Sequence, residues 1–455
     1  MGADCSKRVR AIVAALPCLA LAGSLACQPE SANEGIVGHV KPIEPGEELT
    51  TGARFERFGE APVSGGDVPA GRWFLAPAAT PDDQEKLFRE LETLGYVAGS
   101  KPPTANPTVP PYDAARTWPG INFHVSGHGR VALLTDLDGN VLHQWHVRRE
   151  DGGGDFAAPY IFRARPFPNG DLLALLPGEA LVKIDRDSKV LWRYEARVHH
   201  DFEVLEDGTI YVLNNRARIL PRIDQERPVL EPFIEILSPH GRLLRRVSLL
   251  EAVERSPFAS LYRNSPVRTG DVFHTNTLEV LDGRFADRAP WLKRGNVLTS
   301  FLVLDTIAVV DMETDTVVQA WMGSFRDQHD PKLLDNGNFL LFDNRGGGIA
   351  SSVMEFDPVT GDMKWEYRGD EDDPFFTETC GTTQRFANGN TLITESDRGR
   401  AFEVDRRGEI VWEFFNPYRA GESQEFVAAI LDMQRLPPDF PLDWARPPEG
   451  RSARQ

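Results

Sequence analysis

From about residue 118 to residue 440, short apolar runs alternate with turn dipeptides. Each run is rich in β-branched and aromatic residues over about four to eight positions, which is typical of strands rather than helices. The turns contain Asn-Gly or Asp-Gly, residues that accept the positive φ angles of a two-residue hairpin turn. Four hairpins share this pattern: FPNGDLLALL, LEDGTIYVLN, LDNGNFLLFDN and FANGNTLITES. The chain is therefore predicted to contain an all-β domain of repeated hairpins.

A second repeated unit follows most of these hairpins. In this unit an aspartate precedes a turn, and the next strand ends in a tryptophan at position 145, 192, 321, 365 or 412. Two hairpins make four strands, and the copies ending at Trp321, Trp365 and Trp412 recur every 44 to 47 residues. This strand number and this period are typical of one β-propeller blade. We interpret the tryptophans as packing between blades.

The inner hairpins begin near residues 161, 200, 274, 329 and 381, which gives five blades. A sixth blade forms if the C-terminal segment 425–436 joins one sheet with residues 130–147. Such a closure pairs these two segments, whose unpaired edges would otherwise be costly, and gives every blade a neighbour on both sides. The sequence thus predicts a six-bladed propeller over residues 116–440, with a tail at 441–455; seven blades are the less favoured alternative.

The first 115 residues lack the hairpin pattern. Residues 7–27 have a basic start, an apolar run and small residues before Cys27, which is the organisation of a secretory signal. We divide this part into a lipoprotein-like signal peptide at 1–26, with Cys27 as the lipid-bearing first residue, and a tether at 27–115. Plain secretion is the alternative for the signal. The tether is loop-rich, and a short packing helix is predicted at 81–94, where an ordinary linker is the alternative.

The charge and the cysteine content narrow the range of partners. The chain has 68 acidic and 50 basic residues and a net charge of -18, so its surface repels phosphate backbones and nucleic acid is not an expected partner. After removal of the signal and lipidation of Cys27, Cys380 has no intramolecular partner. Neither a disulfide framework nor a cysteine zinc site is therefore expected.

Three histidines stand in nearly the same register of three predicted inner hairpins. His200, His274 and His329 each precede the glycine of a hairpin turn by eight or nine residues. The first strand of a blade crosses the channel and the second returns, so residues before the first strand and after the second lie at the same mouth. Three arginines follow a turn glycine by eight or nine residues: Arg216, Arg345 and Arg398.

Imidazoles that converge with guanidinium groups fit two chemistries. One is transfer of an oxyanion group, with arginine binding the oxygens, one histidine attacking and another moving protons. The other is metal ligation by three imidazoles. Nearby arginines oppose cation binding, so the first chemistry is favoured and neither a metal nor a cofactor is expected.

At these residues the chain resembles the bacterial PAPS-independent arylsulfotransferases, the aryl-sulfate sulfotransferases. The matching segments include the motifs HHD, HTN and QHD and lie at residues 199–213, 273–283, 299–311, 328–344 and 384–417. The resemblance implies a six-bladed periplasmic propeller that moves sulfate from an aryl sulfate to a phenol through a sulfohistidine, without a nucleotide or a metal. It also implies that His329 carries the sulfate, and that His200 and His274 bind the sulfuryl oxygens and handle the phenol proton. Asn276 of the HTN motif is a predicted substrate-binding residue.

The chain departs from this family at one position that matters for sulfate binding. Where the family commonly has an arginine in the return strand of the fourth blade, this chain reads Ser300-Phe301. Arg345 from the next blade is predicted to replace that arginine, with Arg216 as a further substrate-binding residue. The family's front β-sandwich domain has no counterpart in the loop-rich residues 28–115.

Two other functional classes are alternatives. One is a non-catalytic, lipid-anchored propeller that binds a ligand or a protein partner. The other is a quinoprotein-like dehydrogenase, which is disfavoured because packing between blades explains the repeated tryptophans.

The signal-like run makes a prediction about the mature protein. We expect protein from the membrane fraction to begin at Cys27 and to carry lipid, because the residues before Cys27 have the features of a cleaved signal. Intact-mass spectrometry measures this directly. Retention of Met1 would contradict both export and anchoring.

Overall fold

The computed structural model describes residues 98–149, 158–346, 348, 350–369 and 375–447. The predicted signal peptide, Cys27 and the predicted helix at 81–94 lie outside these residues. Within the described part, no helix is long and apolar enough to cross a membrane.

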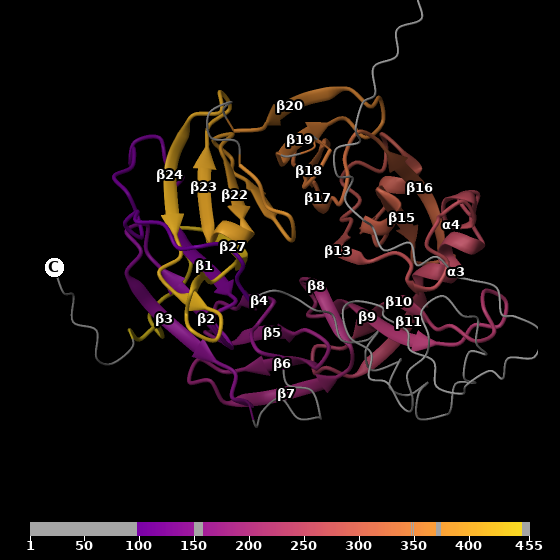
Figure 1. Cartoon of the computed structure of the whole chain (residues 1–455), viewed down its shortest axis with the longest axis horizontal. Coiled ribbons are helices and arrows are strands. Elements are labelled where there is room, and N and C mark those ends of the chain that lie inside the picture. Colours follow the sequence, from indigo (N-terminus) through magenta and orange to yellow (C-terminus); the bar gives the residue numbers. More distant parts are fainter. Residues whose placement is uncertain (1–97, 150–157, 347, 349, 370–374, 448–455) are drawn as a thin grey trace, which may run out of the picture. The chain divides into compact units, whose positions relative to one another are not determined.

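Six β-sheets are arranged around a common centre (Figure 1). The first blade contains β27 (Ile430–Leu436), β1 (Ile121–Ser126), β2 (Val131–Thr135) and β3 (Val141–His146). The second blade contains β4 (Arg163–Pro166), β5 (Leu172–Leu176), β6 (Ala180–Ile184) and β7 (Val190–Glu195). The third blade contains β8 (Val198–Val204), β9 (Ile210–Arg218), β10 (Val229–Leu237), β11 (Leu243–Ser248) and β12 (Gly270–Asp271). The fourth blade contains β13 (Thr275–Val280), β14 (Val297–Phe301), β15 (Thr306–Asp311) and β16 (Thr316–Met322). The fifth blade contains β17 (His329–Leu333), β18 (Phe339–Asp343), β19 (Ser352–Phe356) and β20 (Met363–Tyr367). The sixth blade contains β21 (Thr382–Arg385), β22 (Thr391–Glu395), β23 (Arg400–Val404) and β24 (Ile410–Phe415). The prediction of an all-β, six-bladed propeller is confirmed.

A few short elements connect the blades. The helices α3 (Leu249–Glu254) and α4 (Ser260–Arg263) lie between the third and fourth blades, and the hairpin of β25 (Arg419–Ala420) and β26 (Phe426–Val427) precedes β27. Single turns of 3-10 helix occur at η1 (Pro290–Leu292), η2 (Leu302–Leu304) and η3 (Ser396–Arg398).

The C-terminal strand closes the ring, as predicted. β27 lies in one sheet with β2 and β3, which cover the expected residues 130–147. Its direct partner is β1, one strand earlier than expected, with Ile121 opposite Leu436 in an antiparallel pair. The sequence pattern had not identified β1 because no Asn-Gly or Asp-Gly turn marks it.

The innermost strand is the first strand of its blade along the chain in five blades, and in the remaining blade it is the C-terminal strand β27. Neighbouring inner strands contact each other around the channel. Side chains of one inner strand accept hydrogen bonds from the backbone of the next. Asp201 Oδ2 accepts from Leu278 N at 2.9 Å, and Asp330 Oδ2 accepts from Thr383 N at 2.7 Å. These bonds fix the height of one inner strand against the next, so residues in equivalent registers meet inside the channel.

The repeated tryptophans join neighbouring blades. The indole N–H of Trp145 donates to the carbonyl oxygen of Gly170 at 2.9 Å, and that of Trp321 donates to Pro358 at 2.9 Å. Trp365 and Trp412 make equivalent bonds to turns of the following blades. The interpretation of these residues as packing between blades is confirmed.

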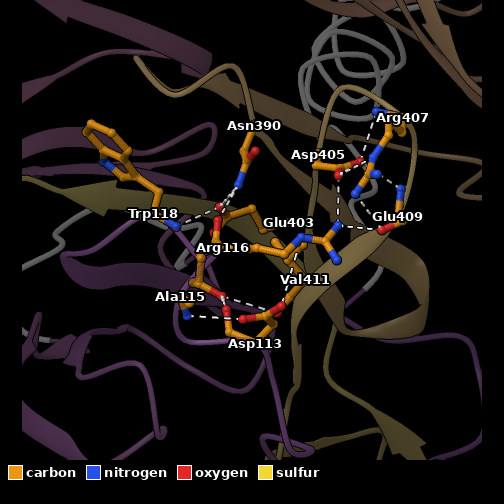
Figure 2. Close-up of polar contacts among 11 residues, drawn as sticks. Asp113, Ala115, Arg116, Trp118, Asn390, Glu403, Asp405, Arg407, Glu409 and Val411 are labelled. Carbon is orange, nitrogen blue, oxygen red and sulfur yellow. Dashed lines mark hydrogen bonds and ion pairs between the residues drawn. The ribbon is translucent and has the colours of Figure 1, made fainter.

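A buried ion pair fixes the closing strand. Arg435 on β27 pairs with Glu403 at 2.5 Å, and both side chains are fully buried. The same guanidinium donates to Asn122 Oδ1 at 2.9 Å and to the carbonyl oxygen of Trp118 at 2.8 Å. Figure 2 shows how the segment before β1 lies against the sixth blade: Trp118 N donates to Glu403 Oε1 at 2.8 Å, and Arg116 lies between the carboxylates of Asp405 and Glu409.

The closure makes a prediction about stability. Glu403→Gln leaves the Arg435 charge buried without a carboxylate, so we expect the free energy of unfolding to fall by about 3 to 5 kcal/mol. Glu409→Gln is the matched control, because that carboxylate is half exposed and its loss is expected to cost less than about 1 kcal/mol. Urea titrations of both variants against the wild type measure the difference. Equal stability of the two variants would contradict a closing role for Glu403.

Candidate active site

The three histidines meet at the start of three neighbouring inner strands. His200 lies in β8, His274 directly precedes β13, and His329 begins β17. The ring centroids of His200 and His274 are 4.8 Å apart, with the rings nearly perpendicular. His329 lines a small cavity together with His200 and Asn276. The structure thus brings together the histidines that the register pointed to.

The backbone of the inner strands is irregular at each of these histidines. His200 and His274 have φ angles of 53° and 45°, in the left-handed region, and Asp330 beside His329 has 56°. The pairing register also shifts next to all three sites. Bulges of this kind redirect a side chain and cost roughly 1–3 kcal/mol per left-handed residue. The same irregularity therefore recurs at the histidine position of three consecutive blades.

The ring of His329 is held in one tautomer. Its Nδ1 lies 2.9 Å from the carbonyl oxygen of Asp327 and 2.8 Å from Asn344 Oδ1. Asn344 donates its own amide hydrogens to the carbonyl oxygens of Thr377 and Cys380, at 3.0 and 2.9 Å, so its oxygen faces the ring. Two acceptors require the proton on Nδ1, which leaves the lone pair on Nε2.

The three imidazoles differ in charge. Burial lowers the pKa of His329 to about 4 and the pKa of His200 well below its usual value. The charge of the nearby His274 lowers both pKa values further. Burial would also lower the pKa of His274, but the hydrogen bond and the charge of Asp271, at 2.6 Å from Nδ1, outweigh it and raise the pKa. At a pH just below the usual histidine pKa, a protonated His274 therefore stands beside a neutral His329 and a neutral His200.

Ser300, at the position where the family commonly has an arginine, is buried in a neutral hydrogen-bonded network. Ser300 Oγ donates to the carbonyl oxygen of Gln328 at 3.2 Å and accepts from Gln328 Nε2 at 3.0 Å. Asn276 Nδ2 donates to the same carbonyl oxygen at 2.9 Å. This buried network positions the residue directly before His329 and includes no cation.

The predicted arginines lie away from the cavity that His329 lines. Arg345 pairs with Asp327 at 3.1 Å and with Glu378, and its side chain is 40% exposed. Arg216 is exposed on β9. Arg398 pairs with Glu395 at 3.4 Å. Arg345 is linked to the site through its ion pair with Asp327, whose carbonyl oxygen also contacts His329.

The sequence reasoning missed three residues around the cavity: Arg163, Asn344 and Cys380. Arg163 and Cys380 line the cavity. Asn344, which directly follows β18, contacts His329. A signal for two of them was present, because Arg163 and Cys380 precede the turn glycines of their own blades, Gly170 and Gly389, by seven and nine residues. Extending the histidine register to every blade would have identified both.

A much larger cavity of about 1080 Å³ occupies the channel toward the far ends of the inner strands. Its walls are formed by apolar side chains such as Phe202 and Phe386 and by charged groups such as Lys332. Arg163 and Asp330 line both cavities. These two residues therefore separate the histidines from the larger chamber.

Comparison with known proteins gives one family and several distant folds. A family model described as Arylsulfotransferase (ASST) matches residues 169–417. No curated protein matches the chain. A solved protein of unknown function from Bacteroides caccae is 12% identical with a TM-score of 0.44, covering 70% of this chain and 98% of that chain. A virginiamycin B lyase from Staphylococcus aureus is 12% identical with a TM-score of 0.33, covering 56% and 70%.

The site makes a prediction about protonation. At pH 6 we expect His329 to be neutral with its proton on Nδ1 and His274 to be mostly charged, because burial lowers the first pKa to about 4 and Asp271 raises the second. Histidine ¹⁵N NMR reports both the charge and the tautomer. A charged His329 at pH 6, or a proton on its Nε2, would contradict this arrangement.

Proposed function

The chain belongs to the arylsulfotransferase (ASST) family, whose model matches more than half of its length, and we propose that it moves a sulfuryl group from a phenolic sulfate ester to a phenol through a sulfohistidine. The observation that carries the proposal is the fixed, neutral ring of His329, with Nε2 left as its nucleophilic nitrogen beside His200 and Asn276. A neutral imidazole is a competent nucleophile near pH 7.

In the first half of the reaction, the lone pair of His329 Nε2 attacks the sulfur of the donor. The bond between sulfur and the aryl oxygen breaks, and the leaving phenolate takes the proton of the His274 imidazolium. His329 becomes an N-sulfo imidazolium, in which the sulfo group keeps its negative charge and the ring carries a positive charge. The oxygens of Asp327 and Asn344 stabilise that charge, because both accept the hydrogen bond of Nδ1.

In the second half, the oxygen of a phenol attacks the same sulfur and the bond between sulfur and Nε2 breaks. Neutral His274 takes the phenol proton, which restores its imidazolium, and His329 returns to the neutral form. Proximity to Asp271 stabilises the charged form of His274 between turnovers. The cycle balances without a nucleotide, a metal or a redox cofactor.

The proposed setting is the cell envelope. Export through the signal at residues 1–26 and lipid attachment at Cys27 would place the propeller in the periplasm, anchored to the membrane. Its proposed partners are small-molecule aryl sulfates and phenols. The acidic surface makes nucleic acid an unsuitable ligand.

The mechanism predicts a graded effect of histidine variants on steady-state transfer from 4-nitrophenyl sulfate to phenol. His329→Ala is expected to abolish turnover, because the nucleophile is lost. His274→Ala and His200→Ala are expected to slow it by ~10²-fold or more, the usual effect of removing one group that stabilises developing charge. His240→Ala, at an exposed turn, is the control and should retain wild-type rates. Wild-type turnover by His329→Ala would reject the assignment.

A further inference from the structure

We infer that Arg163 is the cation that binds the sulfuryl oxygens of the donor, in place of the arginine that is absent at Ser300. The inference rests on the proposed function and adds a substrate-binding residue to it. Arg163 comes from the innermost strand of the second blade, β4, and it lines the same small cavity as His200, Asn276 and His329.

A further cation near the nucleophile would favour transfer of a sulfuryl group, because it stabilises negative charge on the transferring oxygens. The three non-ester oxygens of the donor carry its negative charge, and a guanidinium group binds such oxygens with charge-assisted hydrogen bonds. Ser300 is part of a neutral network. Arg345 already pairs with two carboxylates, Asp327 and Glu378, and does not line the cavity. Arg163 is the arginine that lines it among the described residues.

The guanidinium of Arg163 is held from one side. Its Nη1 pairs with Asp432 Oδ1 at 3.0 Å, and its Nε lies 3.4 Å from both Asp201 Oδ1 and the carbonyl oxygen of His200. The contacts with His200, Asp201 and Asp432 are made by Nε and Nη1, and within the described part of the chain no hydrogen bond from Nη2 is found. The two aspartates thus orient the group and leave one nitrogen for a ligand.

The supporting carboxylates are themselves fixed. Asp201 accepts a hydrogen bond from Leu278 N of the next blade at 2.9 Å, and Asp432 accepts from Gln434 Nε2 at 2.8 Å. Burial raises the pKa of Asp201 to about 6, whereas burial of Arg163 is outweighed by the charges of Asp432 and Asp201, and its pKa is raised. Arg163 therefore stays charged.

In the reaction Arg163 makes no bond to sulfur and transfers no proton. Its Nη2 donates to a sulfuryl oxygen in the donor complex, while His329 Nε2 forms the new bond and the aryl oxygen leaves. The same hydrogen bond holds the sulfuryl group on His329 until the phenol attacks. The position of Arg163 between the histidine cavity and the larger chamber places this contact at the floor of the site.

The test compares four variants in two measurements: the Kd of 4-nitrobenzenesulfonate, an unreactive donor analogue, by calorimetry, and kcat/KM for 4-nitrophenyl sulfate. Arg163→Lys keeps the charge but loses the guanidinium fork. The double variant Arg163→Gln, Asp432→Asn removes the cation without leaving Asp432 as an unpaired buried charge. Arg345→Gln tests the other arginine, and Arg165→Gln is the matched control on the same strand.

We expect both Arg163 variants to lose ~10²-fold or more in kcat/KM and to bind the sulfonate correspondingly weakly. Arg165→Gln and Arg345→Gln are expected to stay within about threefold of the wild type. Thermal unfolding checks that each variant is folded. If the double variant does not fold, Arg163→Lys alone tests the inference. Normal binding and turnover in Arg163→Lys, or a loss confined to Arg345→Gln, overturns this inference. Absence of transfer in the wild type overturns the proposed function instead.

Discussion

Pairing between β27 and β1 is the constraint on which the other parts of the structure depend. Each blade buries its faces only against its two neighbours, so an open ring would expose two faces and two sheet edges. The first and last strands meet in one sheet, and Arg435 ties them to Glu403 of the sixth blade and to the segment before β1. The β27–β1 pairing closes the ring, and the buried ion pair holds the closing strand against the sixth blade.

The closed ring has a chemical consequence. Hydrogen bonds from Asp201 and Asp330 to the next inner strand hold the strands at matching heights, so one register position recurs around the channel. That position carries His200, His274 and His329 in three consecutive blades, Cys380 in the next, and Arg163 one residue off the register in the blade before. A single substitution at this register position therefore changes which side chain enters the channel, because the strand that carries it is held in place by its neighbours.

Much of the fold and part of the site could be predicted from the sequence. The Asn-Gly and Asp-Gly turns and the terminal tryptophans are local signals, and they sufficed for six blades and for a closing strand near residue 430. The histidine register also carried over to the structure, since it depends only on strand length. β1 was missed because its turn lacks the dipeptide.

Other features depend on which way a side chain points, and spacing does not contain that information. Arg345 has the right register, yet it turns toward Asp327 and Glu378 outside the cavity. Asn344, one position earlier, turns inward and fixes the tautomer of His329. The left-handed backbone at His200 and His274 likewise has no signature in the residue types, because neither position is a glycine.

The central claim is that Nε2 of His329 becomes the sulfate carrier. The most direct measurement is peptide mass spectrometry of wild-type protein quenched within one turnover after mixing with an aryl sulfate donor and no acceptor. The account predicts one added sulfuryl group on the peptide that contains His329, which disappears when a phenol is added. A sulfuryl group on another residue, or transfer to phenol with no protein adduct, would contradict it.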